Sequence, residues 1–464
     1  MTAVTEQPRQ RPRWRATDQA SATAEDGRAA RKVAPRKKSA QWDPSARTAP
    51  ALDRLRAQEA VRDHTLLPIR YARMASSPWA YLRGAAAVMA ADLASAPHSG
   101  LTVQMCGDAH VLNFGLWASP ERQLLFDARD FDETLPGPFE WDVKRLVTSI
   151  HVLAATEGIA GSVAEDAVAS ALNAYCTNMR RYATCGELEV WYDRITAEMN
   201  ISQLDSSDAD RMERSIRKQS KKRSSAGATA AVTEVVDGRR RITEAPPKRM
   251  HYSLNAEEEV SVFEQIWVTY LASIPPHLTR LVSRFHREDT VQQVVGVGSV
   301  GMRVYLHLME GDSGNEPVLF QVKQATASVY EPFLQPSPFD NHGQRVTVGQ
   351  RLMQTASDVF LGHVRVDEHD YYVRQFRDMK IIPDGRQISG ILPQFAGFCG
   401  HALAKSHARS GDPAAIDGYI GGGPTFRSAM ADYARAYAQQ TVDDHAELVA
   451  AIDAGTVPTT DTPW

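Results

Sequence analysis

The stretch around which this chain is organised reads Cys106-Gly-Asp-Ala-His-Val-Leu-Asn-Phe-Gly115, and Phe126-Asp-Ala-Arg-Asp-Phe-Asp-Glu133 follows it closely. It places Asp108, Asn113 and Asp130 near one another in sequence, with apolar residues between them that would hold the backbone in place. Carboxylate and amide oxygens bind magnesium, and a carboxylate can also accept a proton during catalysis. We therefore interpret this stretch as a catalytic and metal-binding loop.

The spacing inside the stretch points to one kind of chemistry. Asn113 follows Asp108 by five positions, the separation of the base and the metal-binding Asn in the H-R-D-x-x-x-x-N loop of kinases. Phosphoryl transfer depends mostly on positioning and charge neutralisation. In this interpretation Asp108 accepts the proton of a substrate hydroxyl, while Asn113 and Asp130 hold Mg²⁺ on the phosphates. Asp127 and Asp132 are nearby substitutes, and the alternative is an Asx-turn loop followed by an acidic surface turn.

A second informative region lies late in the chain, where Gly296, Gly298 and Gly301 match G-x-G-x-x-G. The dinucleotide-binding form of this pattern needs a helix directly after the glycines, whereas residues 304–308 alternate with the period of a strand. A strand, a glycine loop, a strand, a turn and a strand with a lysine are the order of the loop that covers ATP phosphates in kinases. Lys323 stands where that lysine pairs with the α- and β-phosphates. The alternative is a Gly-rich hairpin with a surface lysine.

Asp108 and His110 also allow a different interpretation, a metal-dependent phosphoesterase with Asp and His ligands around paired metals. That site needs further His and Asp ligands in comparable loops. Asn341-His342 is the only Asn-His pair in the sequence, and the other histidines are scattered. The phosphoesterase would act on a phosphoester without any need for a nucleotide.

Composition limits the class of protein. A chain of 464 residues is too long for one ordinary core, so two lobes are expected. Hydrophobic content of 43% and charged content of 23% are typical of a soluble globular protein. A net charge of -4 argues against nucleic-acid binding through overall charge. The four cysteines form no CxxC pair, and no secretory or membrane-spanning segment is evident, which predicts a reduced cytoplasmic protein without membrane contact.

Two segments differ from the rest in composition. Residues 1–50 are basic and poor in large apolar side chains, which predicts a disordered arm whose only nucleic-acid role would be weak contact. Residues 206–250 carry dense Arg and Lys followed by small residues, which predicts a mobile basic connector that could be a lid, a partner site or a linker. Between and after these segments, apolar spacing predicts helices within 51–205, interrupted by short β-like runs at 101–105 and 124–126. It also predicts a helix or helix pair over 257–285 and helices over 391–407 and 426–452.

The chain resembles a bacterial domain-of-unknown-function family, number 2252, over nearly everything after residue 50. The stretches that carry this resemblance begin with 77–84, 106–115, 130–133 and 137–142, and they continue with 295–301, 321–323, 349–353, 371–375 and 404–411. Membership implies a fold of the protein-kinase-like superfamily.

The opening stretch is also similar to the G-D-x-H-x-x-N signature of aminoglycoside and choline phosphotransferases. This resemblance implies that Asp108 is the catalytic base, that His110 orients the loop, and that Asp142 is a structural residue opening the next helix. In those enzymes the glycine loop and its lysine precede the catalytic loop, whereas here they follow it by more than a hundred residues. A circular permutation accounts for this order. The helical Glu that pairs with the lysine would be Glu331 or be absent, and the linker beside the adenine would be 371–375.

We therefore expect an α+β, bilobal, kinase-like fold, circularly permuted. Its β-rich nucleotide-covering lobe would span 288–378, and its helical lobe would combine 51–285 with 379–464. The expected function is a phosphotransferase that uses ATP and Mg²⁺ on a small-molecule or protein hydroxyl. The alternative is a nucleotide-binding regulatory pseudokinase, or a kinase-like protein that transfers a nucleotidyl group.

Overall fold

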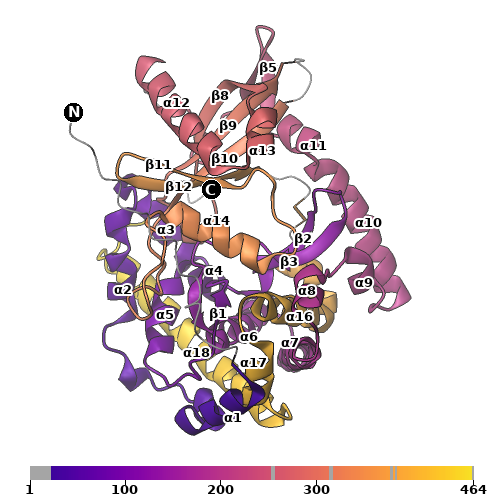
Figure 1. The fold of residues 1–464 in the computed structure, drawn as a ribbon. Coiled ribbons are helices and arrows are strands. Elements are labelled where there is room, and N and C mark those ends of the chain that lie inside the picture. Colours follow the sequence, from indigo (N-terminus) through magenta and orange to yellow (C-terminus); the bar gives the residue numbers. More distant parts are fainter. Residues whose placement is uncertain (1–21, 252–255, 313–316, 377–379, 382–383, 462–464) are drawn as a thin grey trace, which may run out of the picture.

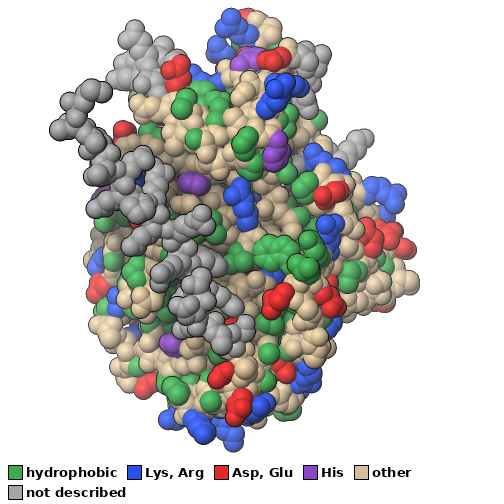
Figure 2. All heavy atoms as spheres, viewed as in Figure 1, with side chains coloured by type: hydrophobic (Ala, Val, Ile, Leu, Met, Phe, Trp, Pro, Cys, Tyr) green, Lys and Arg blue, Asp and Glu red, His purple; other side chains and the backbone are tan. Residues whose placement is uncertain are grey.

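The computed structural model describes residues 22–251, 256–312, 317–376, 380–381 and 384–461. A six-stranded sheet lies at one end of the molecule and a large helical part lies at the other (Figure 1). Acidic and basic side chains are interspersed over the face drawn in Figure 2. Within the described residues, no helix is long and apolar enough to cross a membrane. The chain is thus a mixed α+β protein, as expected.

The six-stranded sheet has the order β11-β12-β10-β9-β8-β7, and every neighbouring pair is antiparallel. Its bounds are β7 (Arg249–Met250), β8 (Phe285–Gln293), β9 (Val304–Gly311), β10 (Pro317–Ala325), β11 (Gly362–Val366) and β12 (His369–Gln375). The strand predicted from the alternation over 304–308, and the strand predicted to carry Lys323, are confirmed by β9 and β10.

Side-chain alternation along β10 separates the two faces of this sheet. Val318, Phe320 and Val322 pack with α12 (Ala256–Ser273) and α13 (Pro276–Val282) in one apolar cluster, and Figure 1 shows these helices against the sheet. Since strand side chains alternate, Gln321 and Lys323 point to the opposite face. That face looks toward the helical part of the molecule.

The helical part is built around one large apolar core. Close approach of α7 and α16 is possible because Gly400 has no side chain: a Cβ there would lie 2.1 Å from the Ala171 carbonyl oxygen. The main helices are α2 (Ala51–Ala57), α3 (Leu67–Ala75), α4 (Pro78–Gly84), α5 (Ala86–Ala94), α6 (Phe139–Thr156), α7 (Gly161–Tyr182), α8 (Glu187–Tyr192), α9 (Ala197–Ile201), α15 (Gly385–Ile388), α16 (Leu392–Ser410), α17 (Pro413–Ile420) and α18 (Pro424–Asp453).

Two short β-ribbons frame the organising stretch. One pairs β1 (Thr102–Met105) with β4 (Leu135–Pro138), and the other pairs β2 (Phe114–Ala118) with β3 (Leu124–Ala128). Residues 106–113 therefore run between β1 and β2, and residues 129–134 run between β3 and β4. Because each ribbon joins one end of both segments, the two acidic loops lie side by side.

Helix α14 (His342–Met353) joins the sheet to the helical part, and Figure 1 shows it between them. Its Arg345, which is only 2% exposed, donates hydrogen bonds to the carbonyl oxygens of Thr134, Asp132 and Thr326 at 2.6 to 2.8 Å. A buried guanidinium whose two terminal nitrogens donate to backbone carbonyls fixes the helix against the acidic loop. The sheet and the loop are thereby held in register.

The expectation of a disordered arm is wrong for residues 22–50, whereas residues 1–21 lie outside the described part. Helix α1 (Ala24–Val33) is closed at its start by a capping box between Thr23 and Asp26. Gly27 lies so close to α17 that a Cβ would meet the Ala415 carbonyl oxygen. Arg47 then forms ion pairs with Asp92 and Asp444. Backbone proximity and ion pairs hold this segment, so its lack of large apolar residues was misleading.

The basic connector is folded as well, contrary to the expectation of a mobile segment. It contains α10 (Ser206–Arg223), α11 (Ser225–Ala230), β5 (Thr233–Val236) and β6 (Arg239–Ile242), and it ends in β7. Asp205 caps α10 by accepting the Asp208 N–H at 2.9 Å. Asp237 and Gly238 have φ of 50° and 77°, as a tight hairpin turn requires. The connector thus reaches from the helical part to the edge of the sheet.

Candidate functional site

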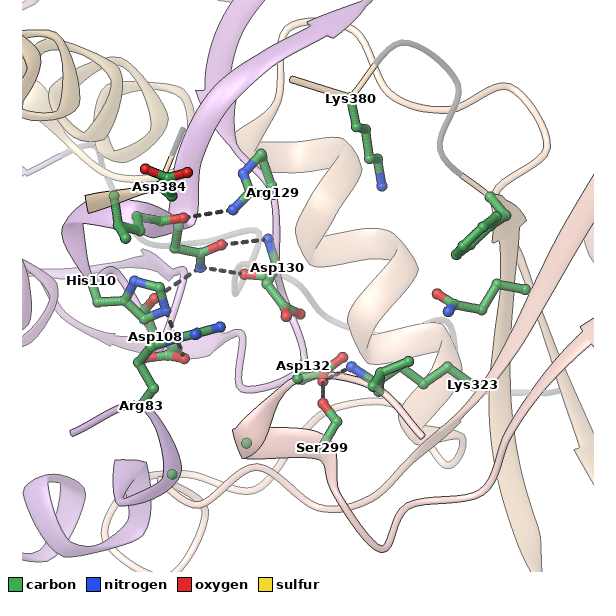
Figure 3. Close-up of a pocket in the computed structure, with 18 of the residues that line it drawn as sticks. Arg83, Asp108, His110, Arg129, Asp130, Asp132, Ser299, Lys323, Lys380 and Asp384 are labelled. Carbon is green, nitrogen blue, oxygen red and sulfur yellow. Dashed lines mark hydrogen bonds and ion pairs between the residues drawn. The ribbon is translucent and has the colours of Figure 1, made fainter. Parts of the chain in front are cut away.

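A cavity of about 1020 Å³ lies between the six-stranded sheet and the helical part. It is strongly charged: eight Lys and Arg and six Asp and Glu side chains line it. The cations are Arg62, Arg83, Arg129, Lys218, Lys222, Lys323, Arg374 and Lys380, and the anions are Asp108, Asp130, Asp132, Glu133, Glu157 and Asp384. Figure 3 shows Arg83, Asp108 and His110 on one side and Lys323 with Ser299 on the other.

Most of the residues singled out from the sequence meet at this cavity. Those that line it are Asp108, His110, Asn113, Asp130, Gly296, Gly298 and Lys323. Gly301 lies apart from the lining, and its φ of +88° favours glycine beside the Arg62 side chain. Residues 297–299 form one short 3-10 turn between β8 and β9, so the glycines stand in a strand–loop–strand context.

The loop that carries Asp108 is held at its start by Asp142. The Asp142 carboxylate accepts the N–H groups of Cys106 at 2.6 Å and Gly107 at 3.0 Å. Gly107 has φ of +80°, and a Cβ there would lie 2.3 Å from the Glu133 carbonyl oxygen. Only glycine fits between the two acidic loops at this point. Asp142, near the start of α6, therefore anchors the first residues of this loop.

Asn113 fastens the two acidic loops to each other. Its Nδ2 donates to the carbonyl oxygens of Asp108 at 2.8 Å and Asp130 at 3.1 Å, and its Oδ1 accepts the Asp130 N–H at 3.0 Å. The side chain is 1% exposed. An amide oxygen has a second lone pair, so the role of Asn113 as a magnesium ligand stays a prediction. In the structure, the Asn113 side chain holds the two acidic loops in position relative to each other.

Asp108 is bound by Arg145, a residue of α6 that the sequence analysis did not single out. Arg145 donates to Asp108 Oδ1 from Nε at 3.0 Å and from Nη2 at 2.8 Å. Burial raises the pKa of the Asp108 carboxyl above its ordinary value, and the Arg145 guanidinium opposes this rise. The ion pair orients the carboxylate, and its Oδ2 lies on the side of His110, at 3.8 Å from Nε2.

His110 is held as a neutral imidazole. Burial, together with the charges of Arg83, Arg145 and Arg129, lowers the pKa of His110 well below its usual range. The ring stands edge-on to Trp79 of α4, with ring centroids 5.3 Å apart. A neutral ring beside Asp108 does not compete with Arg145 for its charge.

Asp130 combines burial with an unusual charge environment. Its Oδ1 is buried and has no hydrogen-bond partner among the described residues. Burial would raise the pKa of Asp130, but Lys323, Arg374 and Arg129 lower it below its ordinary value. An ionised carboxylate with an uncommitted buried oxygen is a group that can take up a cation.

Lys323 pairs with Asp132, and the expected partner Glu331 does not reach it. The Lys323 Nζ donates to Asp132 Oδ2, Tyr372 donates to Oδ1 at 2.8 Å, and Ser299 of the glycine loop reaches Oδ2 at 3.3 Å. Glu331 instead accepts the Ser328 N–H at 3.1 Å. Burial would lower the pKa of Lys323, but Asp132 raises it above the ordinary value. Lys323 is therefore a firmly charged cation.

The expected linker at 371–375 belongs to the sheet, because these residues form most of β12. The chain leaves the sheet after Gln375, and Ile381 then pairs with Leu116 of β2 through backbone hydrogen bonds of 3.0 and 2.8 Å. Arg374, at the end of β12, donates to the Gln321 side chain at 3.0 and 2.9 Å. The sheet wall of the cavity is polar at this position.

Several cavity residues escaped the sequence analysis. Arg83 is the penultimate residue of the family-like stretch 77–84, and its Nε is buried with no hydrogen-bond partner among the described residues. Arg145 follows Asp142 by three positions, close to one helical turn, which is a usable signal. Lys218 and Lys222 lie on one face of α10 with Ser215, in a segment that composition had marked as a connector.

The side chains that could bind a metal ion limit the kind of metal site that this cavity can form. Among the described residues, no group of three or more His, Cys, Asp or Glu side chains is arranged to hold a metal ion. A paired-metal phosphoesterase needs such groups, so nothing here favours that alternative. Mg²⁺ that bridges a nucleotide needs only one or two protein ligands, because phosphates and water complete its shell.

Fold and site together define a mixed α+β protein with a charged cleft between a small antiparallel sheet and a helical body. The chain belongs to the family described as an uncharacterised protein conserved in bacteria (DUF2252), whose model matches residues 62–451. No curated protein and no solved structure gives a significant match to the chain.

Proposed function

We propose that this protein is a phosphotransferase that uses ATP and Mg²⁺, built on a circularly permuted kinase-like fold. The observation that carries the proposal is the meeting of Asp108, Asp130 and Lys323 at one cavity, although Lys323 follows Asp130 by 193 positions. A base, a metal-binding carboxylate and a phosphate-binding lysine are the groups that phosphoryl transfer requires. The acceptor would be a small-molecule or protein hydroxyl.

The order of elements in the sheet supports the kinase-like part of the proposal. A strand, a glycine loop, a strand, a turn, a strand with Lys323, and then helix α14 before two further strands follow one another along the chain. The same order of glycine loop, lysine strand and helix occurs in protein kinases. The catalytic loop precedes this unit here, which a permutation explains.

The residues of the chain would divide the work as follows. Asp108 accepts the proton of the acceptor hydroxyl, and the raised pKa of its carboxyl makes it a better base than an exposed aspartate. Arg145 keeps the carboxylate oriented. Lys323 and Arg83 bring positive charge to the phosphates, and Ser299 holds the glycine loop near them.

Asp130 and Asn113 would hold the magnesium ion. The buried Asp130 Oδ1 without a partner fits a divalent cation, and the second lone pair of Asn113 Oδ1 is compatible with one. When bound, Mg²⁺ neutralises the charge of the phosphates. The excess of cations over anions around the cavity favours a polyanionic ligand on its own account.

One observation favours the alternative of a regulator or a nucleotidyl transferase. Lys323 is paired with an aspartate of the acidic loop, whereas in protein kinases it is paired with a helical Glu. Phosphoryl transfer and nucleotidyl transfer differ in the phosphorus atom of ATP that is attacked, which is the γ-phosphorus in the first reaction and the α-phosphorus in the second.

ATP labelled at the γ- or the α-phosphate separates these outcomes. We expect label from γ-phosphate to reach an acceptor or water, and Asp108→Asn to lower this rate by about 10²–10⁴. Transfer of α-label would establish a nucleotidyl transferase. Binding of ATP without transfer of either label would establish a regulator and contradict the phosphotransferase.

We also propose that the protein works in the cytoplasm, where ATP is available. All four of its cysteines are free, and three of them are buried. Burial raises the pKa of the Cys106 and Cys399 thiols well above their ordinary value, so they stay protonated and unreactive. Free buried thiols are what a reducing compartment allows.

A further inference from the structure

A second, smaller cavity of about 310 Å³ opens beside the charged cleft. It lies where β2 and β3 face α10 and the start of α16, and Figure 1 shows α10 running past these strands. Its wall is mostly apolar, with side chains that include Phe126, Met212, Ile216, Ile388, Phe395 and Phe398. A concave, largely apolar cavity of this size matches the sites that take small organic ligands.

Backbone hydrogen bonds hold the segments that carry the apolar side chains of this pocket. Leu116 and Ile381 exchange both backbone hydrogen bonds, at 3.0 and 2.8 Å. Phe126 N–H donates to the Ile195 carbonyl oxygen at 2.7 Å. Phe395 and Phe398 stand edge-on to Phe126, with ring centroids 5.6 and 6.0 Å apart. This aromatic arrangement suits a ring as guest.

One polar group in the wall lacks a partner. Asn200, at the end of α9, lines the pocket and is only 3% exposed. Its Oδ1 is buried without a hydrogen-bond partner among the described residues. Leaving a buried amide unsatisfied costs about 1–3 kcal/mol, so a ligand that hydrogen-bonds to Asn200 would recover this cost. A hydroxyl fits either orientation of the amide, because it can both donate and accept.

The pocket adjoins the charged cleft. Ser215, Gln219 and Gln387 line both cavities, and Gln219 Nε2 donates to Ser215 Oγ at 3.0 Å across their border. Successive faces of α10 therefore serve the two cavities, with Lys218 and Lys222 on the charged side and Met212 and Ile216 on the apolar side. A molecule in the pocket would therefore lie next to the cleft.

We propose that this apolar pocket binds the acceptor, a small molecule with a ring or hydrocarbon body and a hydrogen-bonding group that reaches Asn200. Its acceptor role rests on the proposed phosphotransferase, since the hydroxyl to be modified would extend into the cleft of Asp108. Binding of the apolar body itself depends only on the pocket. The site thus narrows the substrate class from any hydroxyl to an amphipathic small molecule.

Phenol and toluene test the pocket, because they are nearly equal in size and differ in one hydroxyl. The ¹³C-methyl NMR signal of Met212, assigned with Met212→Leu, should shift saturably with both compounds. Phenol should bind about tenfold more tightly, which is the value of one recovered hydrogen bond. In Asn200→Leu this preference should vanish while toluene binding is kept. Absence of saturable shifts in the wild type, or a preference that persists in Asn200→Leu, overturns the proposal.

A variant that fills the apolar pocket provides the second part of this experiment. Ile216→Phe should abolish binding of both compounds, whereas Val268→Phe, on an exposed position of α12, should leave both unchanged. The Mg-ATP thermal shift is measured on the same samples. Failure of phenol to bind with an intact Mg-ATP shift overturns the pocket alone and leaves the phosphotransferase standing. Phenol binding without any Mg-ATP shift overturns the acceptor role.

Discussion

At the scale of single residues, two aspartates of one short segment do different work. Asp132 neutralises Lys323 at the cavity, and its side chain is 27% exposed. Asp127 pairs with Lys405 in the interior, where both side chains are 1% exposed. The sequence analysis treated both as substitutes for Asp130. The role of each aspartate depends on which lysine the fold brings near it. These lysines lie 191 and 278 positions away in the sequence, so local sequence could not reveal the pairing.

These two ion pairs predict an order of stability losses. Asp127→Asn leaves Lys405 charged and deeply buried, so it should lower the free energy of unfolding by about 3–5 kcal/mol. Asp132→Asn should cost less, about 1–2 kcal/mol, because water and Tyr372 reach that site. Urea denaturation of both variants measures the difference. Equal losses, or a larger loss for Asp132→Asn, would contradict this account of the two pairs.

Lys380 should give the site a pH dependence. Burial, and then the charge of Arg374, lower the pKa of Lys380 to about 7. The folded protein therefore releases this proton at lower pH than the unfolded chain, and the free energy of unfolding should rise with pH from about 7 toward 10. The affinity for a polyanion should instead fall as the pH rises, because Lys380 carries its positive charge only below its lowered pKa.

We accordingly expect the affinity for Mg-ATP to fall about fivefold between about pH 6.5 and pH 8.5. Lys380→Met should remove this part of the pH profile. Because ATP itself titrates in the same pH range, the affinity of each protein for Mg-ATP is measured by isothermal titration calorimetry at each pH. The difference in affinity between the wild type and Lys380→Met is then compared across the pH range. Parallel profiles for the wild type and Lys380→Met would show that Lys380 does not face the ligand.

At the residue scale, the sequence could indicate which side chains lie close together where one short segment carries all of the information. Asp108, His110, Asn113 and Asp130 line one cavity because ribbons close in sequence hold their loops. Asn113 shows the limit: its spacing suggested a metal ligand, yet its amide binds three backbone groups of both loops. Local spacing cannot tell which way an amide faces once the loops close on each other.

At the scale of elements, the loop between β1 and β2 depends on a glycine. Gly107→Ala combines a positive φ with an overlap against the Glu133 carbonyl, so we expect a loss of about 3 kcal/mol or more in the free energy of unfolding. Gly158 has φ of +69° and open space around it. Gly158→Ala should therefore cost only about 1 kcal/mol. Urea titrations of the two variants compare them, and similar losses would mean that the loop yields easily.

Periodicity predicted the elements that bury a regular apolar face, such as β9, β10, α6 and α16. It failed for α1 and for the connector, where apolar content is low. Helix α10 is stabilised by a cap and by the packing of Met212 and Ile216 against the main core. The Asp-Gly pair at 237–238 is a hairpin signal that the sequence carried and that the emphasis on basic charge obscured.

At the scale of the whole molecule, the cleft is assembled from segments that lie far apart in the chain. The segments with Asp108 and Asp130 come before the wall from α10, the sheet with Lys323 comes after it, and lining residues from 380 to 387 follow the sheet. The sequence analysis singled out the segments with Asp108, Asp130 and Lys323. It could not single out the wall from α10, since nothing in a basic, small-residue segment indicates that Lys218 and Lys222 would face a cavity.

The central claim is that these segments form one site for a magnesium-bound nucleotide, and ligand-induced thermal stabilisation tests it most directly. Mg-ATP at about 100 times its Kd should stabilise the wild type by about 2.7 kcal/mol, which shifts Tm by several degrees. Asp130→Asn should lose most of this shift, and Asp53→Asn, an exposed position of α2, should keep it. EDTA should abolish the shift. No shift in the wild type, or an undiminished shift in Asp130→Asn, would contradict the claim.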